Sequence, residues 1–273
     1  MANITGLIGY PVAHSLSPVI HHYWMRQHGI DGAYKLFTTA PARLRQTLLR
    51  FQKNEGMGFN ITVPHKEAVL PFMETLDPVA TRIGAVNTVQ VREGALHGYN
   101  TDAYGFITHL TQQATPSLEH VVILGAGGAA RAAIVALQQA GAVRITLMNR
   151  TWESAQALAQ AFGCEAIAWD VSGTALADAT LVVNTTSLGM AGQPPLNLSL
   201  QHLQSEAVVY DIVYKPLQTS LLKAAANRGC RTVDGLGMLL YQAQKAFEVW
   251  HGVLPAVDDA LRKQVLAQLT EEA

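Results

Sequence analysis

The feature that most constrains this chain's fold is a short apolar run that leads into a glycine-rich loop and then into an alanine-rich stretch of helical length. The run covers residues 121–124, and the loop reads Gly125-Ala126-Gly127-Gly128-Ala129-Ala130. In such a strand, turn and helix the first glycine makes a tight turn, the second lets the backbone approach a pyrophosphate, and the small last residue lets the helix pack closely on the sheet. The sequence therefore predicts a dinucleotide site, with a ligand-free glycine turn as the alternative.

The rest of the chain alternates between short β-branched runs and Ala- or Leu-rich stretches, which is typical of a mainly parallel α/β sheet. In the first part we expect helices at 19–27 and 42–51, strands at 5–9, 33–38 and 58–62, and a hairpin of 86–92 with 95–98. The second part opens with a helical stretch at 100–111 and has strands at 121–124, 145–148, 181–184, 208–212 and 231–233. Two C-terminal helices are expected at 238–250 and 261–269.

The order of these elements predicts two α/β domains. Residues 1–101 would form a substrate-binding and catalytic domain with a mainly parallel sheet. Residues 102–235 have the succession of a Rossmann-type, doubly wound dinucleotide-binding domain. The C-terminal helices, 236–273, are expected to fold back on the first domain and complete it.

The composition fits a two-domain protein that binds small molecules. A chain of 273 residues with 49% hydrophobic content can fill two cores. The net charge of −1 and the scattered Lys and Arg residues argue against a nucleic-acid partner. There is no apolar run of the ~18 residues that span a bilayer, no signal-peptide pattern, and no C-x-x-C spacing of Cys164 and Cys230. We expect a cytoplasmic protein without a membrane partner, either a monomer or a homodimer.

The tip of the second strand of the dinucleotide domain indicates the cofactor. An NAD site usually has Asp or Glu there to bind the ribose hydroxyls, whereas this strand ends in Met148-Asn149-Arg150-Thr151. A guanidinium beside a hydroxyl suits a 2′-phosphate, so the sequence favours NADP. Arg150 could also be an ordinary solvated charge, and Glu153 lies close by.

A nicotinamide cofactor supplies a hydride, so the protein has to supply the proton. The best candidates are Lys66, which follows the strand at 58–62, and Asp102, which lies at the junction of the two domains. Either residue alone could be an ordinary surface charge. The polar residues around them are what favours a catalytic role. These residues could recognise hydroxyl groups, or they could serve as caps and turn formers: Asn60, Thr62, Asn87, Thr88, Asn100 and Thr101.

A second candidate site precedes the first helix. Ser17 is expected to be its N-cap, with Pro18 at the first helical position. Ser15 has no such role. Two hydroxyls beside a helix N-terminus could instead bind a substrate carboxylate.

Taken in order along nearly the whole chain, these motifs resemble those of the shikimate dehydrogenases. The resemblance rests on Ser15-Leu-Ser17-Pro18, Asn60 to Lys66, Ala85-Val-Asn87-Thr88, Asn100-Thr-Asp102, Asn184-Thr-Thr-Ser-Leu-Gly189-Met190, Tyr210-Asp-Ile-Val-Tyr214-Lys-Pro216 and Gly237-Met238-Leu-Leu-Tyr-Gln242. It implies reversible NADPH-dependent reduction of 3-dehydroshikimate to shikimate, on the route to chorismate and aromatic amino acids.

The resemblance also implies roles for individual residues. Lys66 and Asp102 would be the catalytic pair, with Lys66 giving its proton to the carbonyl oxygen. Ser15 and Ser17 would bind the carboxylate, and Thr62, Asn87, Asp102 and Gln242 would bind the ring hydroxyls. The cofactor would contact Gly125, Ala126, Gly127, Gly128, Ala129, Asn149, Arg150, Thr151, Tyr214, Gly237 and Met238.

Some residues depart from the family pattern. Many members have a second basic residue after the Asn-Arg-Thr group, where this chain has Trp152, Glu153 and Ser154, which leaves room for NAD. An NAD-dependent quinate or shikimate dehydrogenase and a non-catalytic metabolite sensor are therefore alternatives. A methyltransferase ranks last. No metal is expected, because no carboxylate or cysteine completes a ligand set with His21, His22 and His28.

Overall fold

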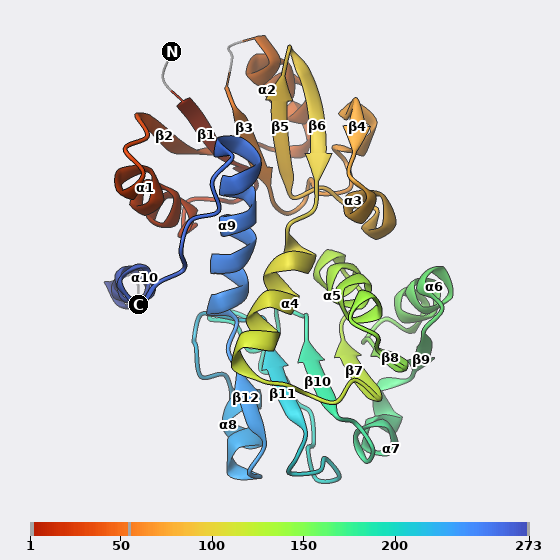
Figure 1. Ribbon diagram of the computed structural model, residues 1–273. Helices are drawn as coiled ribbons and strands as arrows, with labels where there is room; N and C mark the ends of the chain where they lie inside the picture. Colours follow the sequence, from red (N-terminus) through yellow and green to blue (C-terminus); the bar gives the residue numbers. More distant parts are fainter. Residues whose placement is uncertain (1–2, 54–55, 272–273) are drawn as a thin grey trace. The chain divides into compact units, whose positions relative to one another are not determined.

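The computed structural model describes residues 3–53 and 56–271 and divides the chain into two compact units (Figure 1). Unit 1 comprises Met1–Thr101 and Leu240–Ala273, and unit 2 comprises Asp102–Leu239. Within the described residues no helix is both long and apolar enough to cross a membrane. Both units are α/β, which confirms the predicted fold class.

Unit 1 is built on a six-stranded sheet with the order β2-β1-β3-β5-β6-β4. The pairs β1·β2, β1·β3 and β4·β6 are parallel, whereas β5 is antiparallel to both β3 and β6. Glu93 and Gly94 make the tight hairpin turn with φ of 51° and 74°. The strands are β1 (Asn3–Gly9), β2 (Gly32–Thr38), β3 (Gly58–Ile61), β4 (Thr75–Leu76), β5 (Thr88–Arg92) and β6 (Ala95–Tyr99).

Helices cover both faces of this sheet. Apolar side chains of α2 (Leu44–Lys53) pack with Ile8, Phe59 and Val89 on one face. On the other face, Trp250 of α9 (Leu236–His251) packs with Leu7 and Tyr34. The remaining helices of this unit are α1 (Ser17–Gln27), α3 (Pro78–Ile83), α10 (Asp259–Glu271) and the 3-10 turns η1 (Pro41–Arg43) and η2 (Leu70–Phe72).

The C-terminal segment is tied to unit 1 by hydrogen bonds as well as by packing. The Trp250 indole donates to the Val89 carbonyl at 2.9 Å, and the Gln90 amide donates to the Val249 carbonyl at 2.6 Å. Since β5 contains both Val89 and Gln90, α9 is fixed to the middle of the sheet. Figure 1 shows α9, in blue, beside the red to yellow strands of unit 1.

Unit 2 has a six-stranded, wholly parallel sheet with the order β12-β11-β10-β7-β8-β9. This is the order of a doubly wound dinucleotide-binding domain, in which successive strands are added first on one side of the first strand and then, from the fourth strand on, on its other side. Here the change of side lies between β7 and β10. The strands are β7 (His120–Leu124), β8 (Arg144–Met148), β9 (Glu165–Ile167), β10 (Leu181–Asn184), β11 (Val208–Asp211) and β12 (Arg231–Val233).

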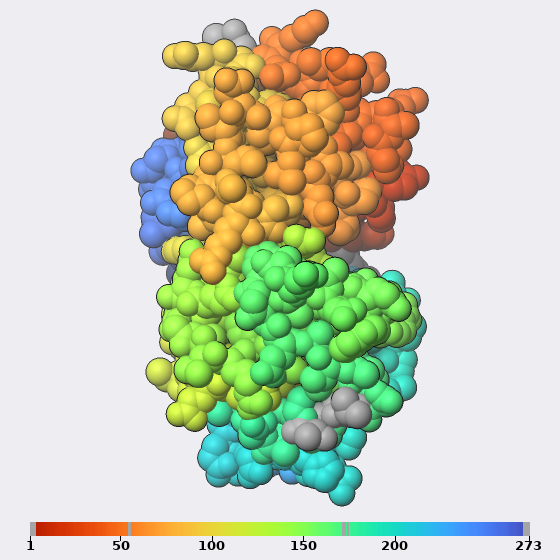
Figure 2. Space-filling view, turned by 90° about the vertical axis from the view of Figure 1, so that its right-hand side faces the viewer, coloured from red at the N-terminus to blue at the C-terminus, as the bar shows by residue number. Residues whose placement is uncertain are grey.

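The helices of unit 2 either precede the first of these strands or connect them. In the space-filling view of Figure 2, the chain from α5 to α7 appears in shades of green on the visible face of this unit. The helices are α4 (Asp102–Gln113), α5 (Gly128–Gln139), α6 (Trp152–Phe162), the 3-10 turn η3 (Trp169–Val171), α7 (Ser172–Leu176) and α8 (Ser220–Asn227).

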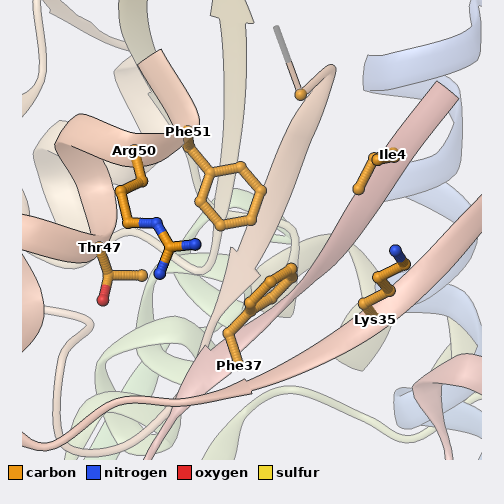
Figure 3. Close-up of a pocket in the computed structure, with 7 residues that line it drawn as sticks. Ile4, Lys35, Phe37, Thr47, Arg50 and Phe51 are labelled. Carbon is orange, nitrogen blue, oxygen red and sulfur yellow. The ribbon is translucent and has the colours of Figure 1, made fainter. Parts of the chain in front are cut away.

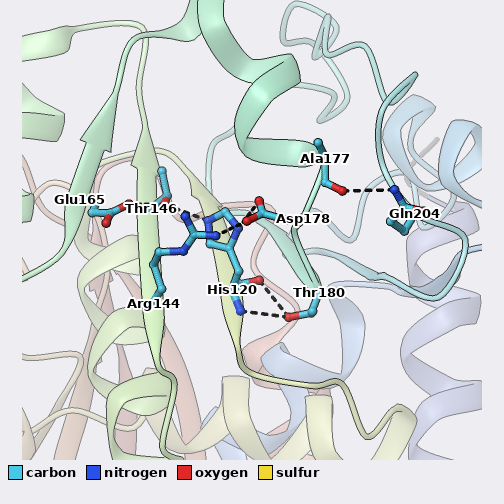
Figure 4. Close-up of polar contacts among 8 residues, drawn as sticks. All are labelled: His120, Arg144, Thr146, Glu165, Ala177, Asp178, Thr180 and Gln204. Carbon is cyan, nitrogen blue, oxygen red and sulfur yellow. Dashed lines mark hydrogen bonds and ion pairs between the residues drawn. The ribbon is translucent and has the colours of Figure 1, made fainter.

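A polar cluster joins the amino ends of three neighbouring strands in unit 2 (Figure 4). Buried His120 lies 2.8 Å from Oδ1 of Asp178 through Nδ1 and 2.9 Å from Oγ1 of Thr146 through Nε2. Thr146 reaches Glu165, and Arg144 pairs with Asp178. Slight burial raises the pKa of Asp178, but the hydrogen bonds from Arg144 and His120 outweigh it, and the pKa falls below its usual value. The cluster links the strands at their amino ends, whereas the glycine loop follows the carboxyl end of β7.

Candidate functional site

The glycine loop has the backbone that its sequence predicts. Gly125 has φ of +112°, and its amide donates to the Met148 carbonyl at 2.8 Å. A Cβ at this position would lie 2.6 Å from Oγ1 of Thr185. Thr185 is itself held by donation to the Leu124 carbonyl at 2.7 Å. Glycine is therefore required at 125 by the fold itself, because the turn passes tightly between β8 and the end of β10.

For Gly127 and Gly128, the packing of the fold does not explain why the residue is glycine. Gly127 is the N-cap of α5, with φ of −95°, and a Cβ on either Gly127 or Gly128 would meet nothing within 4 Å. Ala130 is fully buried, where α5 lies against the sheet. Open space in front of a helix N-terminus is what a diphosphate needs to approach the backbone N–H groups. The loop thus fits a dinucleotide.

The end of β8 forms one wall of a cavity of about 420 Å³. The Asn149 amide donates to the Thr151 carbonyl at 2.9 Å and closes the turn into α6, while Arg150 is exposed. The opposite wall comes from the loops that follow β10. The lining residues are Asn149, Arg150, Trp169, Thr186, Ser187, Leu188, Pro194, Pro195 and Asn197.

A buried pair at the ends of β10 and β11 shapes those loops. The Asn184 amide donates to Asp211 at 2.9 Å, and Asp211 also accepts from the Thr219 hydroxyl at 2.7 Å and the Val213 amide at 3.1 Å. Burial raises the pKa of Asp211, although these donors oppose the rise. Asn184 in turn accepts from the amide and hydroxyl of Thr186. The family motifs around 184 and 211 therefore meet in one network.

Sequence reasoning missed this pairing, since it treated the two motifs separately. The available signal was an amide and a carboxylate at the ends of two strands that a doubly wound sheet makes neighbours.

The start of α9 packs against α4. A Cβ on Gly237 would lie 2.2 Å from Nε2 of His109, whose Nδ1 is 2.9 Å from the Tyr210 hydroxyl. The close approach of His109 therefore explains glycine at 237, whatever contact it makes with a cofactor. Met238 and Tyr214 are half-buried in the same unit.

In unit 1 the two serines lie together, but the predicted cap is wrong. α1 begins at Ser17 with Leu16 as its N-cap, and the apolar Leu16 side chain forms no capping hydrogen bond. The Ser17 amide instead donates to the Ser15 hydroxyl oxygen at 3.2 Å, and the two hydroxyls are 3.2 Å apart. A serine two residues back satisfies the first helical N–H, so the Ser17 side chain is directed elsewhere, toward Tyr34.

A buried hydrogen-bonded chain runs on from Tyr34 through the middle of the sheet. The Tyr34 hydroxyl donates to Oδ1 of Asn60 at 2.7 Å, and the Asn60 amide donates to the Asn87 carbonyl and to Oγ1 of Thr88. Burial raises the pKa of Tyr34, so the hydroxyl stays protonated, although its bond with Ser17 opposes the rise.

The chain of bonds then reaches Gln242 of α9. Oδ1 of Asn87 accepts from the Thr101 amide at 2.7 Å, and the Asn87 amide group lies 2.9 Å from Oγ1 of Thr101 and 3.5 Å from Oε1 of Gln242. Two residues predicted to bind ring hydroxyls, Asn87 and Gln242, are thus brought together although 155 positions separate them.

Thr62 and Lys66 lie in the turn that follows β3. The Thr62 amide donates to the Ile8 carbonyl at 2.9 Å, and the Lys66 carbonyl accepts from the Val86 amide at 2.8 Å. Nε2 of buried His65 lies 2.7 Å from the Thr39 carbonyl oxygen, and this contact ties the turn to the end of β2. Lys66 is half-buried, and Asp102 is the first residue of α4 in the other unit. The pairing of Lys66 with Asp102 remains a prediction.

Comparison with known proteins identifies the family. Three family models match in chain order: the shikimate dehydrogenase substrate binding domain over residues 7–89, shikimate / quinate 5-dehydrogenase over 109–191, and the shikimate 5'-dehydrogenase C-terminal domain over 235–266. The shikimate dehydrogenase (NADP(+)) of Rhodospirillum rubrum is 48% identical, with 98% of each chain covered. This chain belongs to the shikimate dehydrogenase family.

Solved structures of the family agree with this assignment. Shikimate 5-dehydrogenase from Thermus thermophilus, in complex with NADP(H) and shikimate, gives a TM-score of 0.90 at 36% identity, covering 98% of this chain and 100% of that one. Quinate dehydrogenase from Corynebacterium glutamicum, in complex with NAD, also gives 0.90, at 32% identity, covering 97% and 99%. The family fold therefore accommodates both nicotinamide cofactors.

Proposed function

We propose that this chain is an NADP-dependent shikimate dehydrogenase, which reversibly reduces 3-dehydroshikimate to shikimate on the route to chorismate and aromatic amino acids. The observation that carries the proposal is the near-complete 48% identity to an NADP(+)-dependent shikimate dehydrogenase. The buried amide and hydroxyl network of unit 1 supports it, because such groups suit a polyhydroxylated ring.

We further propose that unit 2 binds the cofactor. The open space at Gly127 and Gly128 admits the diphosphate to the start of α5. Ala126 and Ala129 flank it, and Gly125 sets the turn. Asn149, Arg150 and Thr151 face the adenosine phosphate, and Tyr214, Gly237 and Met238 lie toward the nicotinamide end. When bound, NADPH supplies the hydride.

The substrate is proposed to bind to unit 1. Ser15 and Ser17 present adjacent hydroxyls to its carboxylate at the start of α1. Thr62, Asn87, Gln242 and Asp102 bind the ring hydroxyls. The hydrogen bonds of Asn87 to the Thr101 amide and hydroxyl fix which side of its amide faces the ring.

Lys66 is proposed to hold the proton that the reaction needs. Its ammonium donates a hydrogen bond to the carbonyl oxygen and transfers the proton as that oxygen becomes negative. Asp102 is proposed as the second member of this catalytic pair. The tie between the Lys66 carbonyl and the Val86 amide keeps the side chain on a rigid turn.

NAD use is a second candidate, favoured by one observation. Residues 152–154 place no second cation next to Arg150, and a family member at 32% identity is solved with NAD. NADP remains our choice because Arg150 stands where a ribose-binding carboxylate would be needed. A cytoplasmic location and a monomer or homodimer complete the proposal.

The test is nicotinamide absorbance with purified protein, shikimate or quinate, and NADP or NAD. We expect NADP-linked shikimate oxidation to be fastest, and Lys66→Ala to lower kcat by about 10²–10⁴-fold, the range for loss of a general acid. Lys223→Ala, at an exposed position of α8, is the matched control and should keep full activity. Faster quinate oxidation with NAD would move the chain to the quinate branch. An active Lys66→Ala would reassign the proton donor.

A further inference from the structure

A second cavity lies in unit 1, away from the proposed substrate residues. It has a volume of about 180 Å³ and is lined by Ile4, Lys35, Phe37, Thr47, Arg50, Phe51 and Gly56. Ile4 is near the amino end of β1 and Gly56 precedes β3, whereas Ser15, Thr62 and Lys66 follow the carboxyl ends of these strands. The cavity is therefore at the other end of the sheet from the substrate site.

The floor of this cavity is aromatic. The rings of Phe37 and Phe51 meet edge to face with centroids 4.9 Å apart, and Phe51 packs on Phe59 in the core at 4.6 Å. Phe37 lies across Gly6, where a Cβ would come within 2.5 Å of the ring. Both rings are thus fixed from behind and present a rigid apolar surface.

Two cations stand on either side of this floor (Figure 3). The Arg50 guanidinium descends from α2 beside the rings, and Lys35 projects from β2 on their other side. Within residues 3–53 and 56–271, neither forms a salt bridge, and none of the lining residues is acidic. A cation in the last turn of α2 complements the helix dipole, which would account for Arg50. It does not account for Lys35 on a neighbouring strand.

We propose that this cavity binds a small aromatic monocarboxylate, with its ring against Phe37 and Phe51 and its carboxylate bonded by Arg50 and further attracted by the charge of Lys35. The volume is below the ~300–1,000 Å³ of ordinary ligand pockets, so it admits a single ring. An arginine fork suits a carboxylate. An amino acid is disfavoured, since its ammonium would face two cations with no acidic partner among the described lining residues. The proposal does not rest on the dehydrogenase activity.

The test is an amide NMR titration of the 273-residue chain with benzoate, run once without shikimate and once with shikimate saturating, and with no cofactor present. We expect saturable shifts at Lys35, Phe37 and Thr47 with a Kd of about 1 mM. Benzamide, a neutral isostere, should bind about tenfold more weakly, because charge-assisted hydrogen bonds are lost.

Variants on exposed positions decide which residues hold the carboxylate. Arg50→Gln and Lys35→Gln should each weaken benzoate binding about five- to tenfold, while Arg45→Gln, on the same helix but outside the cavity, should leave it unchanged. Unchanged unfolding midpoints would show that all three variants fold. The proposal is overturned if benzoate shifts no cavity residue, if shikimate abolishes those shifts, or if Arg50→Gln behaves as Arg45→Gln does.

Discussion

The hydroxyl of Tyr34 donates to Oδ1 of Asn60 at 2.7 Å, and both residues are buried. Because the Asn60 amide group donates at the same time to the Asn87 carbonyl and to Thr88, every hydrogen-bonding atom of the Asn60 side chain is engaged. Tyr34 thus determines the orientation of an amide one step away from Asn87. It is a positioning residue for the proposed substrate site.

Tyr34→Phe should therefore cost stability. The substitution keeps the ring but leaves Oδ1 of Asn60 buried without its donor, which costs about 1–3 kcal/mol. Urea unfolding measures the loss. Tyr99→Phe is the control, since the Tyr99 hydroxyl is bonded at a half-exposed site and should lose no more than ~0.5 kcal/mol. Equal losses in the two variants would contradict the role given to Tyr34.

Two glycines of the same loop should respond in opposite ways to alanine. Gly125→Ala meets both a positive φ and Thr185, and should lower the free energy of unfolding by about 1–3 kcal/mol. Gly127→Ala meets open space at an ordinary φ, so it should lose only the ~0.5–1 kcal/mol that alanine costs at an N-cap, yet raise KM for NADP about tenfold. Urea unfolding and cofactor kinetics separate the two. A normal KM in folded Gly127→Ala would mean that the diphosphate binds elsewhere.

Arg150→Gln tests the choice of cofactor. If the guanidinium binds the 2′-phosphate, its loss should raise KM for NADP about 10–100-fold, the range for a charged hydrogen bond, and leave KM for NAD nearly unchanged. Arg231→Gln, at the exposed first residue of β12, should alter neither constant. A parallel rise in both constants would place Arg150 outside the phosphate site.

His21 gives a pH prediction. It is fully buried against Tyr34, with ring centroids 4.3 Å apart, and neither ring nitrogen has a hydrogen-bond partner among the described residues. Burial first, and then the charges of His251 and His22, hold the pKa of His21 well below its usual value. The unfolded chain therefore takes up a proton near pH 6.5 that the folded chain does not.

The free energy of unfolding should accordingly decrease as the pH is lowered. Below about pH 6.5 the unfolded state binds the extra proton, and His21 lowers the free energy of unfolding by up to ~1.4 kcal/mol per pH unit. His21→Phe keeps an aromatic ring and removes this contribution. The free energy of unfolding of the variant minus that of the parent should therefore increase as the pH is lowered from about 7 to about 5. His22 and His251, whose pKa values burial also lowers, titrate in both proteins and cancel. Parallel curves in urea unfolding would exclude His21 as the source.

The sequence predicted the elements where local pattern and burial agree. The buried runs of unit 2 have no competing helical period, so β10 (Leu181–Asn184) and β12 (Arg231–Val233) were predicted with their observed bounds. The hairpin turn was predicted because Glu93-Gly94 suits positive φ. Helices α3, α6 and α8 were not predicted. Helices α3 and α8 have only 6 and 8 residues, too few for a clear helical period. Helix α6 has 11 residues with buried apolar positions at helical spacing, and this signal was overlooked.

The site was predicted as a set of residues, without the bonds that join them. Ser17 was taken as a cap because Ser before Pro usually is one, yet the Ser15 hydroxyl accepts the Ser17 amide and Ser17 faces Tyr34. Tyr34 itself carried no signal, since a tyrosine on a strand is most often core. Its role depends on Asn60, 26 positions away, and no local pattern encodes that contact.

Unit 2 interrupts unit 1 in the chain, and this has a consequence for synthesis on the ribosome. Residues 102–239 can emerge and fold before the last 34 residues, 240–273, exist. Until then, β5 has neither the Trp250 nor the Gln90 bond to α9, and Asn87 has no Gln242 beside it. The half of the protein that is made first is therefore the last to be completed, and a nascent chain acquires the proposed nucleotide-binding unit before the proposed substrate-binding unit is whole.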